Sequence, residues 1–356
     1  MLGQRYYFYL FYINALVSVT ACIPQILYKE RFNGSLTSLI LSTLVGAILL
    51  YLFQALIKNF HSETISEGLN KLFQSKIQKG FLFFYFIMSI FSGTLFLNSI
   101  MQVIGRFTKL NTNLIFLILL LLITFSMMSK TNSILFMLEM TVLFVTPFLL
   151  LIVLRFSTDN LVLMDSIKQS LTYIMHLPRM NSIVSSLFVF TGFTNLLVFS
   201  KHIEPFSRKH LLIIFPVICI VLYAAYFIPI GYFGLNGVGA ESYVWVTTID
   251  SMRIDYFFLE RLVLIFILIL IGVTLVYIII SFHSSLKFFQ IMTSDFGGNL
   301  RWIVLFIIVL SGLMTQYYLE EFSLLKFFHY FFIFRIISDL SLLGLLFYAS
   351  KKQIKT

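Results

Sequence analysis

Long apolar segments, separated by short polar interruptions, run along the whole chain. Each segment is a continuous apolar run and not an alternation of apolar and polar residues, so the pattern predicts helices rather than barrel strands. A hydrocarbon core about 30 Å thick needs roughly 20 apolar residues per helix, and most of the segments are about that long. The pattern therefore predicts about ten transmembrane helices, at residues 6–28, 36–57, 81–103, 112–128, 133–154, 182–200, 211–233, 258–282, 300–316 and 327–349.

The composition supports this interpretation. Hydrophobic residues make up 59% of the 356 residues and charged residues 11%, whereas a soluble domain has about 45–50% apolar and about 25% charged residues. Because the connections between the predicted helices are short, we expect no soluble domain. Residues 1–356 are therefore predicted to form a single all-α, polytopic integral membrane domain.

The formal net charge of +10 comes from Lys and Arg residues that flank predicted membrane helices, and it does not indicate a nucleic-acid partner. Lys and Arg residues are scattered through short loops, where they flank the predicted helices. They are more numerous in the loops on the side of the N-terminus than in the loops on the opposite side. Both termini are therefore expected to be cytoplasmic.

Three connections are long enough to hold further structure. In residues 58–80, apolar side chains recur at helical spacing, which predicts a short interfacial helix on the cytoplasmic side. Residues 155–181 and 234–257 are predicted to lie on the outer side, where they are long enough to cover a pocket.

Charged residues inside a membrane span are costly, so they are candidates for coupling or structural roles. Arg335 and Asp339 are four residues apart, so on a helix they share a face and are expected to form a structural ion pair. Glu260 and Arg261 lie near the end of a predicted helix. Extension of their side chains to the interface explains them almost as well as a functional role does.

Glu139 lies inside the fifth predicted helix with no opposite charge at helical spacing. An unpaired carboxyl group there is expected to be protonated or to face a polar cavity. Two interpretations remain open: a proton relay or coupling group, and a neutral, hydrogen-bonded packing residue.

Two of the predicted helices contain small or polar residues beside a helix breaker. In the first helix, residues 18–22 (SVTAC) precede Pro24, and the sixth contains residues 190–195 (FTGFTN). Broken backbone is tolerated inside a membrane only where it lines a cavity or is buried in protein. The two breaks occupy the same place in successive five-helix halves, which an inverted-repeat transporter predicts. The alternative is two ordinary helices that contain Pro and Gly.

The sequence contains no recognisable catalytic or metal-binding motif. The six His residues are dispersed, and there is no P-loop, HExxH or GxSxG segment. Cys22 and Cys219 both lie inside apolar runs, where cysteine acts as a small hydrophobic residue. We therefore expect neither an enzyme nor a metal site, and no cofactor.

The order of several features resembles that of a known family. Residues 21–24 (ACIP) lie at the end of the first predicted helix, residues 63–69 (ETISEGL) in the first cytoplasmic loop, and residues 190–193 (FTGF) in the sixth helix. Residues 257–262 (FFLERL) begin the eighth helix, and residues 351–352 (KK) follow the tenth. This order resembles the permease-like B-subunits of spore germinant receptors, a family similar to the amino acid/polyamine/organocation transporters.

The resemblance implies a LeuT-like five-plus-five inverted repeat in which helices 1 and 6 are broken. It also implies a nutrient-sensing function, with an amino acid or a similar small solute as the ligand. The implied partners are an A-type membrane subunit and a C-type lipoprotein of the receptor. The implied location is the inner membrane of the endospore.

Carried onto this chain, the resemblance implies a ligand site at mid-membrane between helices 1 and 6, where backbone amides of the half-helices hold a ligand carboxylate. Transporters of this superfamily place glycine in the broken part of helix 1. This chain has no glycine between Gly3 and Gly34, which predicts a smoother first helix and leaves another small solute open as the ligand. The implied ligand-binding residues are Ser18, Val19, Thr20, Ala21, Asn98, Thr191, Gly192, Phe193 and Thr194.

Two other functions remain open. One is an amino-acid transporter, which Glu139 would couple to protons. The other is a water or small-ion channel whose polar path is lined by helices 1, 6 and 8.

Overall fold

The computed structural model describes residues 2–57, 75–107, 111–204, 206–241, 243–252, 262–293, 298–319 and 321–353. Regular secondary structure in these ranges is helical, apart from one isolated bridge between Leu2 and Ile203. Among the described residues, eight helices are long and apolar enough to cross a membrane, and nine if the bent pair at the N-terminus counts as one span. The chain is therefore an all-α polytopic membrane protein, as its composition predicts.

The helices follow the predicted apolar segments closely, and two short helices lie in the longer connections, residues 155–181 and 234–257. In chain order the helices are α1 (Arg5–Ala21), α2 (Ile23–Lys29), α3 (Ser35–Ile57), α5 (Ser75–Phe107), α6 (Thr112–Met127), α7 (Thr131–Thr158), α8 (Met164–Leu171), α9 (Met180–Phe188), α10 (Phe193–Phe199), α11 (Arg208–Gly237), α12 (Val244–Ser251), α13 (Leu262–Thr293), α14 (Gly298–Tyr318) and α15 (Glu321–Gln353), with 3-10 turns η2 (Ser200–His202) and η3 (Val238–Ala240).

Helix α6 agrees with the predicted residues 112–128 but is short for a membrane span, whereas α13 is longer than predicted. Helix α6 has 16 residues, or about 24 Å at 1.5 Å per residue, which is short for a complete span. Helix α13 continues to Thr293, well beyond the predicted end at residue 282. It continues because its polar residues are buried: His283 bonds to Thr131 Oγ1 at 3.0 Å and to the Met127 carbonyl at 2.8 Å. The predicted interfacial helix lies outside the described residues over 58–74.

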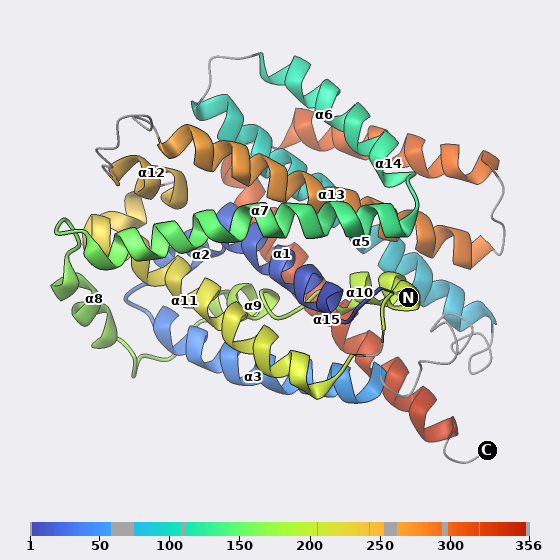
Figure 1. Cartoon of the computed structure of the whole chain (residues 1–356), viewed down its shortest axis with the longest axis horizontal. Coiled ribbons are helices and arrows are strands. Elements are labelled where there is room, and N and C mark those ends of the chain that lie inside the picture. Colours follow the sequence, from blue (N-terminus) through green and yellow to red (C-terminus); the bar gives the residue numbers. More distant parts are fainter. Residues whose placement is uncertain are drawn as a thin grey trace.

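Figure 1 shows α1 in the centre of the bundle, with α6 and α14 at one edge and α3 at the other. Helix α1 packs against α7, α11 and α13, and α5 packs along α13. Most of α1 is buried, as expected for a helix that is apolar all round. Helix α1 begins, and α15 ends, at one end of the bundle, whereas α8 and α12 lie at the opposite end.

The first break separates α1 from α2, and the two helices meet at an angle of 49°. Cys22 lies between them with non-helical backbone angles (φ −155°, ψ −24°). Pro24 is the second residue of α2, and a proline here removes one backbone donor and crowds the preceding turn. The expectation of a smooth first helix is therefore wrong, because proline produces the bend without glycine.

The second break separates α9 from α10. Helix α9 ends at Phe188, and Gly192 precedes α10 with φ +116°. This conformation is open to glycine and strained for residues that carry a Cβ. The side chain of Phe190, within the break, packs so closely on Gly46 of α3 that a Cβ at position 46 would overlap its ring.

Replacing Gly192 by Ala is expected to lower the free energy of unfolding by about 1–2 kcal/mol, the strain of an L-residue at positive φ. A Cβ at this position would lie 3.6 Å from Asn14 Cγ, an ordinary contact, so the loss reports backbone strain and not a clash. Thermal unfolding of the purified protein in nanodiscs measures the effect.

Gly344→Ala in α15 is the matched control, because a Cβ there would meet no atom of the described residues within 4 Å. It is expected to be neutral or stabilising, by up to about 1 kcal/mol. Equal losses in the two variants would contradict the assignment of strain to Gly192.

Candidate functional site

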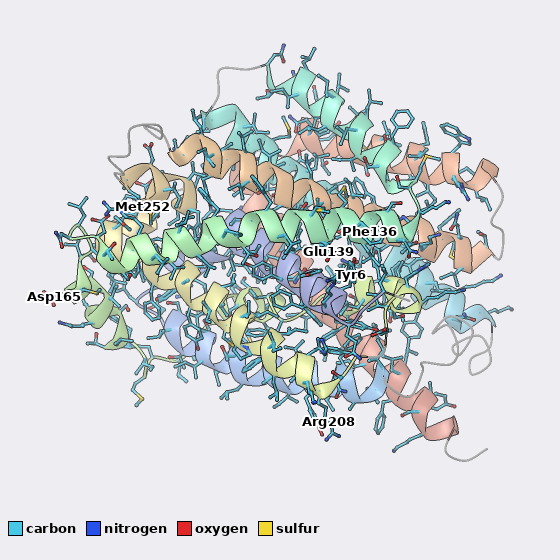
Figure 2. All side chains as sticks on the ribbon, in the orientation of Figure 1. Tyr6, Phe136, Glu139, Asp165, Arg208 and Met252 are labelled. Atoms are coloured by element: carbon cyan, nitrogen blue, oxygen red, sulfur yellow. The ribbon has the colours of Figure 1, made fainter. Side chains whose placement is uncertain are left out.

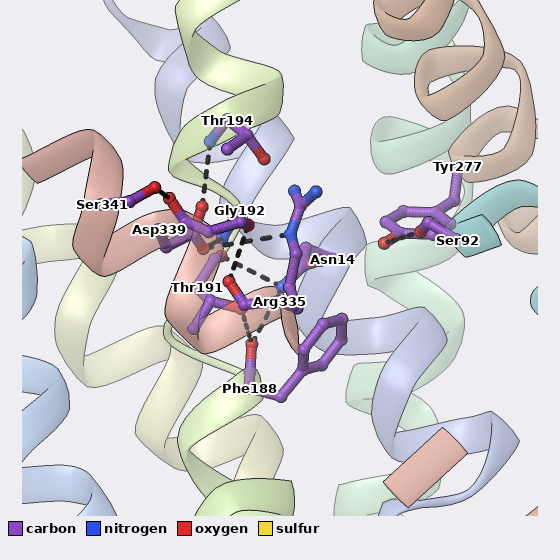
Figure 3. A network of polar contacts seen from close by, with 11 residues as sticks. Asn14, Ser92, Phe188, Thr191, Gly192, Thr194, Tyr277, Arg335, Asp339 and Ser341 are labelled. Atoms are coloured by element: carbon purple, nitrogen blue, oxygen red, sulfur yellow. Dashed lines mark hydrogen bonds and ion pairs between the residues drawn. The ribbon is translucent and has the colours of Figure 1, made fainter. Parts of the chain in front are cut away.

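The carboxylate of Asp339, on α15, closes one side of the α9–α10 break. Its Oδ2 accepts a hydrogen bond from the Gly192 amide at 2.8 Å, and its Oδ1 accepts one from the Thr194 amide at 3.1 Å. These amides begin the second half of the broken helix, so they have no partner within it. A carboxylate is a strong acceptor for such donors. Figure 3 shows this network from close by.

Asn14, on α1, closes the other side of the same break. Its Nδ2 donates to the carbonyl of Phe188 at 3.3 Å and to the carbonyl of Thr191 at 3.1 Å. The hydroxyl of Thr191 also donates to the Phe188 carbonyl, at 2.6 Å. Three separate segments, α1, α9–α10 and α15, are thus joined at one buried place.

Arg335 lies one helical turn before Asp339, as the spacing predicts. Its Nε is 3.9 Å from Asp339 Oδ2, and the two side chains are only 1% and 2% exposed. The two charges therefore neutralise each other, although this distance is too long for a hydrogen bond. The predicted ion pair is present, and both of its side chains are buried.

This arrangement changes the interpretation of the α10 amides. The resemblance to the germinant-receptor B-subunits implied that these amides hold a ligand carboxylate. The chain's own Asp339 accepts their hydrogen bonds instead, so a ligand carboxylate cannot bind there while Asp339 is in place.

Glu139, on α7, has partners that its own helix does not provide. Its Oε1 lies 2.8 Å from Arg5 Nη2, and its Oε2 accepts a hydrogen bond from the Tyr6 hydroxyl. Figure 2 labels Tyr6 and Glu139 side by side where α1 passes α7. The expectation that Glu139 has no counter-charge is therefore wrong, because Arg5 reaches it from α1. Glu260 and Arg261 lie outside the described residues.

The other residues implied for the ligand site do not surround one space. The hydroxyls of Ser18 and Thr20 donate to carbonyls of α1 itself. Asn98 donates to Thr315 Oγ1 of α14 at 2.7 Å, so it faces away from the breaks. Phe193 stacks on Phe53 of α3, with the ring centroids 4.6 Å apart.

A cavity of about 250 Å³ lies beside the α1–α2 break. Ala21, at the end of α1, is the implied ligand residue that lines it, and η3 lies along one wall. The remaining lining residues come from α2, α5, α15 and the segment after η3, and those with polar side chains are Gln25, Tyr28, Lys29, Ser99, Gln102, Glu241 and Tyr243.

A second cavity, of about 260 Å³, lies between α1, α7 and α11. Val19 and Thr20 line it, together with aliphatic and aromatic side chains. Its lining includes the exposed outer residues Leu150, Val153 and Ile220, so this cavity faces the lipid rather than an aqueous solute.

Comparison with known proteins assigns no family: the sequence matches no protein-family model and no curated protein.

The sequence interpretation missed Asn14, Gln25 and Gln102. Each is a polar residue inside or at the end of an apolar run, which is a usable signal. The roles of Asn14 and Gln102 were hidden because they depend on partners more than a hundred residues away, Thr191 for Asn14 and Tyr243 for Gln102.

Asp339→Asn is expected to lower the free energy of unfolding by about 3–5 kcal/mol, because it leaves the Arg335 charge buried without a counter-ion. The double variant Arg335→Gln/Asp339→Asn should recover part of this loss, since no unpaired charge then remains. Denaturant unfolding of the wild type, both single variants and the double variant measures the coupling. Strictly additive losses would show that the two charges do not depend on each other.

Proposed function

We propose that this protein senses a small nutrient, an amino acid or a similar solute, and that the nutrient binds in the cavity beside the α1–α2 break. One observation carries the proposal: the cavity reaches the interrupted backbone at Ala21 and is lined by polar groups of both charge signs. Bound solute and broken helix are then adjacent. A change in occupancy can act directly on the bend.

The size and chemistry of the cavity support a small polar ligand. Its volume of about 250 Å³ is below the roughly 300–1,000 Å³ of pockets for drug-sized molecules. Lys29 of α2 and Glu241 after η3 both line it, so an anionic and a cationic group of one ligand each have a partner. Tyr243 donates to Gln102 Oε1 at 3.4 Å, a contact that a polar ligand can replace.

We place this function on a transporter-like scaffold, as the resemblance to germinant-receptor B-subunits implies. Two interrupted helices that pack together, with α2 against α9, support a LeuT-like five-plus-five inverted repeat with broken helices 1 and 6. Under this proposal an A-type membrane subunit and a C-type lipoprotein receive the signal. The chain lies in the inner membrane of the endospore with both termini cytoplasmic.

The signal arises from differential binding. A ligand shifts a conformational equilibrium only when it binds one state more tightly than the other. The bend at Cys22 changes the direction of α2 relative to α1, and α2 forms part of the cavity wall. A ligand that fits the cavity at one angle of α2 therefore stabilises the conformation with that angle. The change in the position of α2 then passes to the partner subunits.

A secondary transporter is the second candidate, and the paired interruptions favour it as well, because transporters bind substrates between broken helices. Uptake of radiolabelled amino acid into proteoliposomes that contain only this chain would favour the transporter. Solvent or ion flux that persists without nutrient would favour a channel.

Ala21→Trp fills the cavity and is expected to abolish nutrient binding. The measurement is ligand-induced thermal stabilisation of the purified protein in nanodiscs, screened over amino acids and other small nutrients, followed by germination of spores that carry the variant. Leu44→Trp on the lipid-facing surface of α3, where Leu44 is 60% exposed, is the matched control and should bind normally. Nutrient binding that survives Ala21→Trp would place the ligand elsewhere.

A further inference from the structure

The guanidinium of Arg335 is the most unusual polar group among the described residues. Its side chain is 1% exposed, and Nε, Nη1 and Nη2 have no hydrogen-bond partner within the described part of the chain. Arginine stays protonated in proteins and carries five N–H donors. A full positive charge and a set of strong donors are therefore enclosed in the helix bundle.

Asp339 does not satisfy these donors. Both of its oxygens accept backbone hydrogen bonds, from Gly192 and Thr194. Its closest approach to Arg335 is to Nε, at 3.9 Å, so Nη1 and Nη2 form no ion pair with it. Figure 3 shows the outer end of the guanidinium extending away from the Asp339 carboxylate.

Several hydroxyl groups belong to the elements around Nη1 and Nη2 of the Arg335 guanidinium. Figure 3 places it between Thr194 on one side and the pair Tyr277–Ser92 on the other. Thr194 Oγ1 and Ser281 Oγ are buried and have no hydrogen-bond partner in the described ranges. Ser281 follows Tyr277 by one turn of α13, so the two share a face. The Tyr277 hydroxyl lies 2.9 Å from Ser92 Oγ.

We propose that Nη1 and Nη2 of Arg335 bind a small monovalent anion, a halide or the carboxylate of a small solute, with the hydroxyls of Thr194 and Ser281 as additional donors. The groups of Arg335, Thr194 and Ser281 that have no partner are donors or hydroxyls that can donate, which suits an acceptor-only ligand, whereas Asn14 Oδ1 is an acceptor without a partner in the same network. The planar guanidinium presents paired N–H groups to such a ligand. An anion would accept hydrogen bonds from the Arg335 donors that Asp339 leaves without a partner.

This proposal goes beyond the nutrient site and does not rest on it. The nutrient cavity lies at the α1–α2 break and does not include Arg335. An anion at Arg335 would stabilise the packing of α10, α13 and α15 in a receptor, a transporter or a channel. Loss of nutrient binding in Ala21→Trp therefore leaves the anion test unaffected.

The test compares sodium chloride, sodium formate and sodium gluconate at equal ionic strength, with the purified full-length protein in nanodiscs. We expect chloride or formate, but not the bulky gluconate, to raise the unfolding temperature by several degrees in a saturable manner. Stabilisation by chloride alone identifies a free halide site. Stabilisation by formate alone identifies a carboxylate site.

Arg335→Gln should abolish the anion-specific shift, whereas Arg301→Gln, at an exposed position of α14, should keep it. Because Arg335→Gln also leaves Asp339 unpaired and can prevent folding, the double variant Thr194→Val/Ser281→Ala provides a second measure. This double variant retains the positive charge of Arg335. It should raise the half-saturating anion concentration about tenfold, as expected for lost hydrogen bonds to a charged ligand. The same unfolding temperature in all three salts would overturn the proposal, and so would an anion response unchanged in the double variant.

Discussion

The Asp339 carboxylate on the amides of Gly192 and Thr194 is the interaction on which the rest of the structure depends. Inside a bilayer, an open backbone amide has no water to bind, so a helix can be broken only where the protein supplies partners. Asp339 of α15 supplies the acceptor, and Asn14 of α1 supplies the donor for the carbonyls of Phe188 and Thr191. The break is thus a joint between three helices, and aromatic contacts of Phe188 with Phe331 and Phe332 surround it.

This joint explains why the two candidate ligand sites lie where they do. Because Asp339 occupies the amides of α10, that place is closed to a ligand carboxylate, and the cavity that remains beside broken backbone lies at the α1–α2 bend. Because Asp339 is shared with the backbone, Arg335 keeps unpartnered donors on its far side. The position of one carboxylate therefore accounts for the places of both the proposed nutrient cavity and the proposed anion site.

The sequence predicted what depends on local patterns and missed what depends on distant contacts. The positions of the apolar helices follow from runs of apolar residues, and the Arg335–Asp339 pair follows from its spacing of four. Pro24 and Gly192 marked the places of the two breaks, although the absence of glycine near Pro24 predicted a smoother first helix. The partner of Glu139 could not be found in this way, because Arg5 is on another helix. Asn14 gave only a weak signal, a polar residue in an apolar run, because its function depends on carbonyls more than 170 positions away.

Hydrogen exchange at the amides of Gly192 and Thr194 tests the central claim most directly. In the wild-type protein in nanodiscs, peptides that cover these amides should be protected to the same degree as the buried part of α9. In Asp339→Ala the same peptides should exchange much faster, while peptides from α3 keep their protection and show that the fold is intact. Protection that is unchanged without the Asp339 carboxylate would contradict the claim that this side chain closes the broken helix.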